Sequence, residues 1–132
     1  MNLRFRDLPS LTVCAKLSAV SFDSPKKNLE VYRLISALSG PQRFFASEHD
    51  KILQRLGKPL GDGSYSVADV IDEYRTELDR LSDIELTETI PVPSISEDDF
   101  DSDKCVYPPD KTFWMNAQDI HSILTFIQKL KN

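Results

Sequence analysis

Apolar residues recur with helical spacing over residues 25–56. Ser24 can cap the first turn of this helix, and Pro25 suits the first helical position. Gly40-Pro41 interrupts the pattern, because proline lacks an N–H donor and collides with the preceding turn. We therefore predict one long kinked helix or two nearly collinear helices, ended by Gly57 in a left-handed cap. The expected buried stripe is Leu29, Tyr32, Leu34 or Ile35, Leu38, Phe44, Phe45, Ile52, Leu53 and Leu56.

Three shorter segments also carry a helical pattern. Ser10 is expected to cap a helix that ends near Phe22. Ser66 is expected to open a second helix by accepting from the N–H of Asp69. Asn116 opens the last helix. The apolar stripe of that last helix is predicted to be Ile120, Ile123, Leu124, Ile127 and Leu130.

The remaining segments predict only minor strand. Polar and apolar residues alternate over Met1–Asp7, which favours a short strand. Residues 84–92 favour an extended edge segment, since Pro91 and Pro93 cannot donate to a sheet. Residues 94–111 form an irregular, acidic and proline-containing segment. The prediction is a mainly α fold (α+β with minor edge strands), in which the long helix packs against two or three shorter amphipathic helices within one domain over residues 1–132.

Composition narrows the class of protein. The chain has 132 residues and two cysteines, Cys14 and Cys105, too few for a disulfide framework. That usage favours a reducing cytoplasm. No apolar run reaches the roughly 20 residues that a membrane helix needs, so no membrane association is expected.

The net charge of −5 hides an asymmetry between the two halves of the chain. Residues 1–60 sum to +5, and residues 61–132 sum to −10. Either the halves pair with each other in the fold, or they form a bipolar surface that steers a partner. A nucleic-acid partner is unlikely, because DNA-binding domains usually have a pI above about 9, and this chain has a pI near 5.0.

Candidate chemistry is sparse. Asp99, Asp101, Asp103 and Asp110 occupy ligand positions of a calcium loop, but Lys104 stands where the loop needs glycine. The two histidines and two cysteines lack the spacing of a zinc site. We therefore expect no catalytic residue, no metal ligand and no cofactor. The expected partner-binding residues are the acidic side chains of the irregular segment and one aromatic anchor: Asp98, Asp99, Asp101, Asp103 and Trp114.

The order of elements resembles that of small uncharacterised helical proteins encoded by tailed bacteriophages and prophages. The resemblance runs over nearly the whole chain. The long helix that ends in Leu56-Gly57 departs from the family pattern at Gly40-Pro41. The matching segments are Leu3-Arg4-Phe5-Arg6-Asp7-Leu8, Ala15-Lys16-Leu17, Asp62-Gly63, Tyr74–Leu81, Ile84-Glu85-Leu86 and Asn116–Ile120 with Leu124 and Ile127.

The resemblance implies a setting rather than an activity. The expected function is that of a non-enzymatic phage accessory protein that binds another protein, of the phage or the host, or a further copy of itself. It would be a small assembly component in the virion, or an inhibitor of a host factor in the bacterial cytoplasm, with residues 97–103 imitating phosphates. The alternatives are a metal-dependent enzyme, through the acidic segment, and a nucleic-acid-binding protein, through the basic first half.

Overall fold

The structure is a computed structural model, and it describes residues 3–132. This range contains four α-helices: α1 (Leu11–Ala19), α2 (Pro25–Leu56), α3 (Ile71–Ser82) and α4 (Ala117–Lys131). Short antiparallel pairs join β1 (Ser21–Phe22) to β4 (Cys105–Val106) and β2 (Lys58–Pro59) to β3 (Tyr65–Ser66). The predicted mainly α fold with minor strands, built on one long helix, is confirmed.

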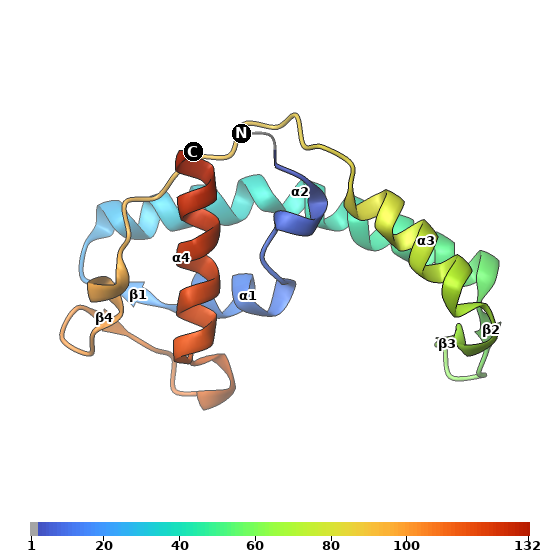
Figure 1. The fold of residues 1–132 in the computed structure, drawn as a ribbon. Coiled ribbons are helices and arrows are strands. Elements are labelled where there is room, and N and C mark those ends of the chain that lie inside the picture. Colours follow the sequence, from blue (N-terminus) through green and yellow to red (C-terminus); the bar gives the residue numbers. More distant parts are fainter. Residues whose placement is uncertain (1–2) are drawn as a thin grey trace.

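Helix α2 is continuous through Gly40-Pro41, so the first of the two alternatives holds. Its 32 residues span about 48 Å at 1.5 Å per residue. A residue before proline normally avoids the helical region because its Cβ meets the proline ring. Gly40 has no Cβ, which explains how the helix passes this point. Figure 1 shows that the two halves of α2 run in different directions.

Most of the predicted helix starts are confirmed. Ser10 accepts a hydrogen bond from the N–H of Val13, and Ser24 accepts one from Lys27. Asn116 and Asp119 form a reciprocal capping box at the start of α4. Helix α1 ends at Ala19, before the expected Phe22, because the chain there becomes β1.

Two predicted caps are wrong. Ser66 accepts from the N–H of Ala68 rather than Asp69, and a 3-10 turn, Ala68–Val70, precedes α3. Gly57 does end α2, but in extended backbone with a φ of −80°. Glycine is needed there for a different reason: a Cβ at this position would lie 2.6 Å from the Leu53 carbonyl oxygen and 2.8 Å from Tyr65 Cβ.

The molecule consists of a body and a projecting arm (Figure 1). The body contains α1, the first half of α2, α4 and the β1–β4 pair around one apolar core. The arm is the second half of α2 packed against α3 and closed by the β2–β3 hairpin. Within the described residues, the buried hydrophobic side chains of the arm are Ile52 and Leu81, which are 8% and 7% exposed. The core of the body contains Val13, Cys14, Leu17, Val20, Phe22, Val31, Leu34, Leu38, Ile90, Ile95, Phe100, Cys105, Met115, Ile123, Phe126 and Ile127.

The predicted strands are reduced to a single bridge. Arg4 pairs with Glu85, and the N–H of Phe5 donates to the Ile84 carbonyl at 3.2 Å. A 3-10 turn, Phe5–Asp7, then ends the pairing, because Asp7 accepts from the N–H of Arg4. Met1 and Asn2, which belong to the predicted strand, lie outside the described residues.

The oppositely charged halves of the chain pair with each other. Seven of the nine ion pairs among residues 3–132 join residues 1–60 to residues 61–132. Six of these pairs join a basic residue of the first half to an acidic residue of the second, so the predicted pairing of the halves is present. The second interpretation concerns the charges outside these pairs. The seven pairs are Arg4–Asp83, Arg4–Glu85, Arg6–Asp83, Lys16–Asp119, Lys27–Asp99, Arg55–Glu77 and Asp7–Lys129.

Helix α4 provides a stability test of the core. Ile123 is fully buried, while Leu124 is half-buried at the edge of the core. We expect Ile123→Ala to lower the free energy of unfolding by about 2–5 kcal/mol, and Leu124→Ala by clearly less, because less cavity is created. Urea denaturation of both variants measures this. Equal losses would mean that the helix packs by a different face.

Candidate protein-interaction surface on helix α2

The outward face of α2 exposes large apolar side chains between positive charges. Tyr32 is 68% exposed, Phe44 49% and Leu29 46%. Spacings of three and four residues place them on one side of the helix with exposed cations and small residues. We call this surface the α2 ridge: Lys26, Leu29, Tyr32, Arg33, Ser36, Gly40, Arg43 and Phe44.

The exposure of the ridge shows that the predicted buried side of α2 is partly wrong. The sequence pattern assigned Leu29, Tyr32 and Phe44 to the buried stripe. In the structure, Leu38 of that stripe and Leu34, one of its two alternatives, are buried as predicted, whereas Leu29, Tyr32 and Phe44 are exposed. Val31, which the predicted stripe omits, is 4% exposed, so the buried stripe shares only part of the predicted one. Helix α2 therefore has more apolar surface than the body covers. Residues 25–44 contain apolar side chains on the outward side of the helix as well as on the buried side. This excess of apolar residues is the feature of the sequence that indicates an exposed apolar surface.

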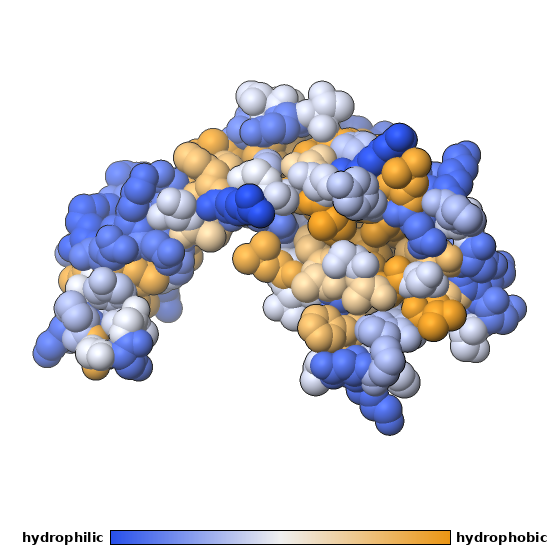
Figure 2. Space-filling view, turned by 180° about the vertical axis from the view of Figure 1, so that it is seen from behind, coloured by the Kyte–Doolittle hydropathy of each residue, from blue (hydrophilic) through white to orange (hydrophobic). Residues whose placement is uncertain are grey.

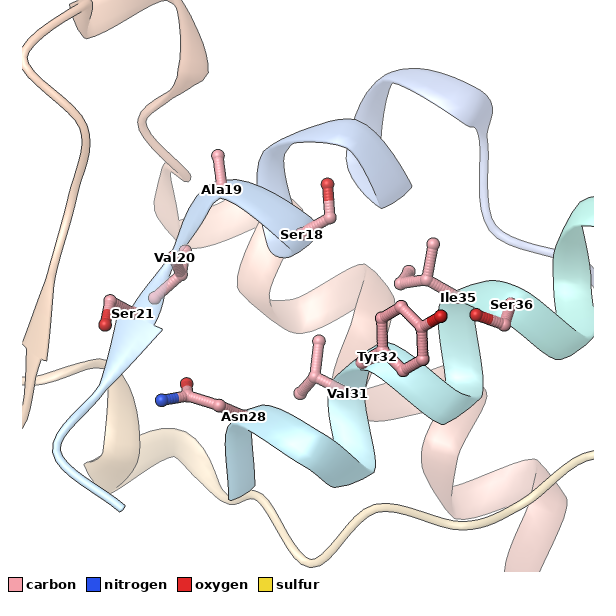
Figure 3. Close-up of a pocket in the computed structure, with 9 residues that line it drawn as sticks. All are labelled: Ser18, Ala19, Val20, Ser21, Asn28, Val31, Tyr32, Ile35 and Ser36. Atoms are coloured by element: carbon pink, nitrogen blue, oxygen red, sulfur yellow. The ribbon is translucent and has the colours of Figure 1, made fainter. Parts of the chain in front are cut away.

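A hollow of about 380 Å³ lies on one side of the ridge. Figure 3 shows its two walls, with Val31, Tyr32 and Ile35 on α2 and Ser18 and Ala19 at the end of α1 opposite them. The side-chain amide of Asn28, at one end of the hollow, is hydrogen-bonded within the protein. The N–H of Phe22 donates to Asn28 Oδ1 at 2.8 Å, and Asn28 Nδ2 donates to the Phe22 carbonyl at 3.1 Å. The free lining of the hollow is therefore mainly apolar.

A second hollow, of about 530 Å³, lies further along the ridge. Its floor is Gly40 and Pro41, and its far wall is the extended segment 84–88. Phe44 and Phe5 form one side, with stacked rings whose centroids are 5.8 Å apart. Ser36 lines both hollows, so they adjoin along the helix. In the space-filling view of Figure 2, apolar residues gather on the body, whereas the arm is mostly hydrophilic.

The ridge carries unneutralised positive charge. Lys26, Arg33 and Arg43 form no ion pair with any described residue. The neighbouring carboxylate of Glu30 is directed to Ser94, whose N–H and hydroxyl donate to it at 2.6 and 2.9 Å. These bonds, chiefly the backbone one, lower the pKa of Glu30. The ridge therefore attracts acidic surfaces.

The acidic residues predicted to bind a partner separate into two groups. Asp98, Asp101 and Asp103 are exposed and form no ion pair within the described residues. Asp99 is 6% exposed, receives a hydrogen bond from Lys27 Nζ at 2.6 Å, and accepts from the N–H of Ser96 at 2.9 Å. Asp99 therefore anchors the irregular segment to α2, and its side chain is not available to a partner.

Trp114 is 44% exposed and is held in place by its neighbours. Its indole N–H donates to the Pro108 carbonyl at 2.6 Å. Tyr107 packs against the ring at a centroid distance of 5.9 Å, and the Lys111 ammonium lies 5.6 Å from its centre. Trp114 is thus an exposed aromatic side chain held in one position, and its role as an interface anchor stays a prediction.

The structure brings the histidines and cysteines to separate places. His49 Nε2 lies 2.6 Å from the hydroxyl of Tyr74, inside the arm. Cys14 and Cys105 are buried, and burial raises the pKa of both thiols. Within residues 3–132, no group of three or more histidine, cysteine, aspartate or glutamate side chains is placed to hold a metal. No helix in this range is long and apolar enough to cross a membrane.

No protein-family model matches the chain, and neither the curated proteins nor the solved structures compared with it match.

The Lys27–Asp99 pair predicts a pH dependence of stability. Burial raises the pKa of Asp99, but the hydrogen bonds from Lys27 and Ser96 and the Lys27 charge outweigh it, and the pKa lies below 3.8. The stability that this carboxylate contributes is therefore present above pH 3.8 and is lost as the pH falls through the folded-state pKa.

We expect Asp99→Asn to cost about 1–3 kcal/mol of unfolding free energy at pH 7, because Lys27 loses its charged partner. The deficit relative to the wild type should shrink at acidic pH, which urea denaturation from pH 7 to about pH 2.5 would measure. The exposed neighbour provides the control, since Asp98→Asn should change stability by less than about 0.5 kcal/mol. A deficit that stays constant with pH would contradict the assignment.

Proposed function

We propose that this chain is a non-enzymatic protein-binding protein that binds its partner through the α2 ridge. The observation that carries the proposal is the exposure of Tyr32, Leu29 and Phe44 beside Arg33 and Arg43, between two adjoining hollows. Tyrosine, phenylalanine and arginine are enriched at protein interfaces, where aromatic side chains and arginine supply most of the binding energy. The hollows can accept side chains of the partner.

The character of the hollows favours binding over catalysis. The side-chain amide of Asn28 is hydrogen-bonded within the protein. Apolar side chains line both hollows, together with three serines in the first hollow and with Glu85, Thr87 and Glu88 in the second. The calcium-loop residue Asp99 is committed to Lys27. These contacts offer less support to a metal-dependent enzyme than to a docking surface. The acidic pI likewise favours a protein partner over a nucleic acid.

For the biological setting, we propose an accessory protein of a tailed phage or prophage, on the family resemblance of its sequence. It would act either as a small assembly component in the virion or as an inhibitor of a host factor in the bacterial cytoplasm. The identity of the captured partner decides between the two. Recovery of phage proteins only, or of a further copy of this chain, supports assembly, and one host enzyme at near-stoichiometric yield supports inhibition.

The test is affinity capture from phage-infected bacterial cells with a matched pair of variants. Tyr32→Ala removes the most exposed of the large apolar side chains of the ridge, and Leu60→Ala removes a 58% exposed side chain at the tip of the arm. Both substitutions are at the surface, so both should leave stability within about 0.5 kcal/mol of the wild type, which thermal melting verifies.

We expect Tyr32→Ala to reduce recovery of the principal partner at least about tenfold, the loss typical of an interface anchor. Leu60→Ala should recover it like the wild type. Equal recovery by both variants, or no captured protein at all, would contradict a partner site on the ridge.

A further inference from the structure

One end of the body carries negative charge that the chain leaves unpaired. We call this surface the acidic end: Glu97, Asp98, Asp101 and Asp103, all exposed and without an ion pair in the described part of the chain. Val106 and Trp114, from the segment that follows, are 69% and 44% exposed. The surface therefore combines acidic with apolar groups, as the α2 ridge combines basic with apolar groups.

The acidic end and the ridge adjoin at the first turn of α2. Lys27 follows Lys26 but points about 100° round the helix from it, to the side that faces the core, where it binds the buried Asp99 at 2.6 Å. The N–H of Asp23 also donates to the Lys104 carbonyl at 2.9 Å, which ties the loop after the acidic end to the start of α2. Positive and negative surfaces thus lie side by side on a braced part of the body.

Adjacent surfaces of opposite charge are self-complementary under a two-fold rotation. Turning a second copy by 180° places its acidic end on the ridge of the first and its ridge on the acidic end of the first. Such an arrangement would neutralise both surfaces and cover Tyr32 and Leu29.

The ridge is long enough to span a dimer interface of standard size. A standard interface buries about 800 Å² on each partner, roughly a tenth of the 8460 Å² surface of this chain. From Lys26 to Phe44 the ridge extends about 27 Å along the helix, which is the width of a patch of that size.

On these grounds we propose that the occupant of the α2 ridge is a second copy of this chain, in a two-fold dimer that pairs each ridge with the acidic end of the other copy. The proposal rests on the protein-binding function proposed above and names the partner. Because the contact is electrostatic and exposed to solvent at its rim, the dimer should weaken as salt concentration rises.

The test is sedimentation equilibrium of the full chain with charge-reversed variants. We expect a species of twice the 15.0 kDa chain mass at low salt. Arg33→Glu with Arg43→Glu reverses the ridge, and Asp98→Lys with Asp101→Lys reverses the acidic end. Either double variant alone should weaken the dimer at least about tenfold, because like charges then oppose each other at both contacts.

Mixing the two variants should restore the dimer. The mixed pair then has one contact of native charge and one with both charges reversed, so both contacts attract. Lys58→Glu with Arg80→Glu is the control, since it changes net charge as much as reversal of the ridge does, but on the arm. It should dimerise like the wild type. All variants are checked for an unchanged helical spectrum and melting temperature.

Three results would overturn the dimer. They are a single 15.0 kDa species up to about millimolar concentration, a dimer that the ridge variant and the arm control weaken equally, and failure of the mixture to associate. The proposed function fails separately. The chain can be monomeric and still capture a protein, with the capture lost in Tyr32→Ala. In that case the ridge is a docking site for a partner other than a second copy.

Discussion

The length of α2 is the constraint on which the rest of the structure depends. A compact chain of 132 residues has a radius of gyration of about 14 Å, whereas α2 alone spans about 48 Å. The body therefore covers only part of the helix. The remainder needs its own partner and finds it in α3, which lies back along it to form the arm. Gly40 makes this possible, because an intact helix through Pro41 joins arm and body without a loop.

The same constraint produces the candidate site. A helix that forms one wall of a small core buries a single stripe, here Val31, Leu34 and Leu38. The first half of α2 carries a further set of large side chains, and these have no core to enter. Exposing Tyr32, Leu29 and Phe44 has a cost in hydrophobic free energy, since burial of such side chains is worth about 1.5–3 kcal/mol each. A partner that covers them recovers that energy, which is why the ridge is the favoured docking surface.

Electrostatics decide how the irregular segment is held. Pairing between the basic and acidic halves fastens distant parts of the chain together, and Lys27–Asp99 fastens the irregular segment to the start of α2. The pairing is incomplete: Arg33 and Arg43 on one side, and Asp98 and Asp101 on the other, remain at the surface. The charge asymmetry of the sequence therefore has both consequences. Some charged residues pair inside the chain, and others form charged surfaces.

The sequence alone determined the helices and most of their starts, because capping by Ser10, Ser24 and Asn116 and the 3.6-residue period are local properties. It also marked Trp114 and the acidic segment. Only the tertiary structure decided which stripe of α2 is buried, because Leu29 and Val31 are equally apolar and the choice depends on what α1 and α4 place against them. Nor could the sequence separate Asp99 from Asp98, since a carboxylate becomes an internal anchor only when folding brings a lysine from 72 residues away within 2.6 Å of it.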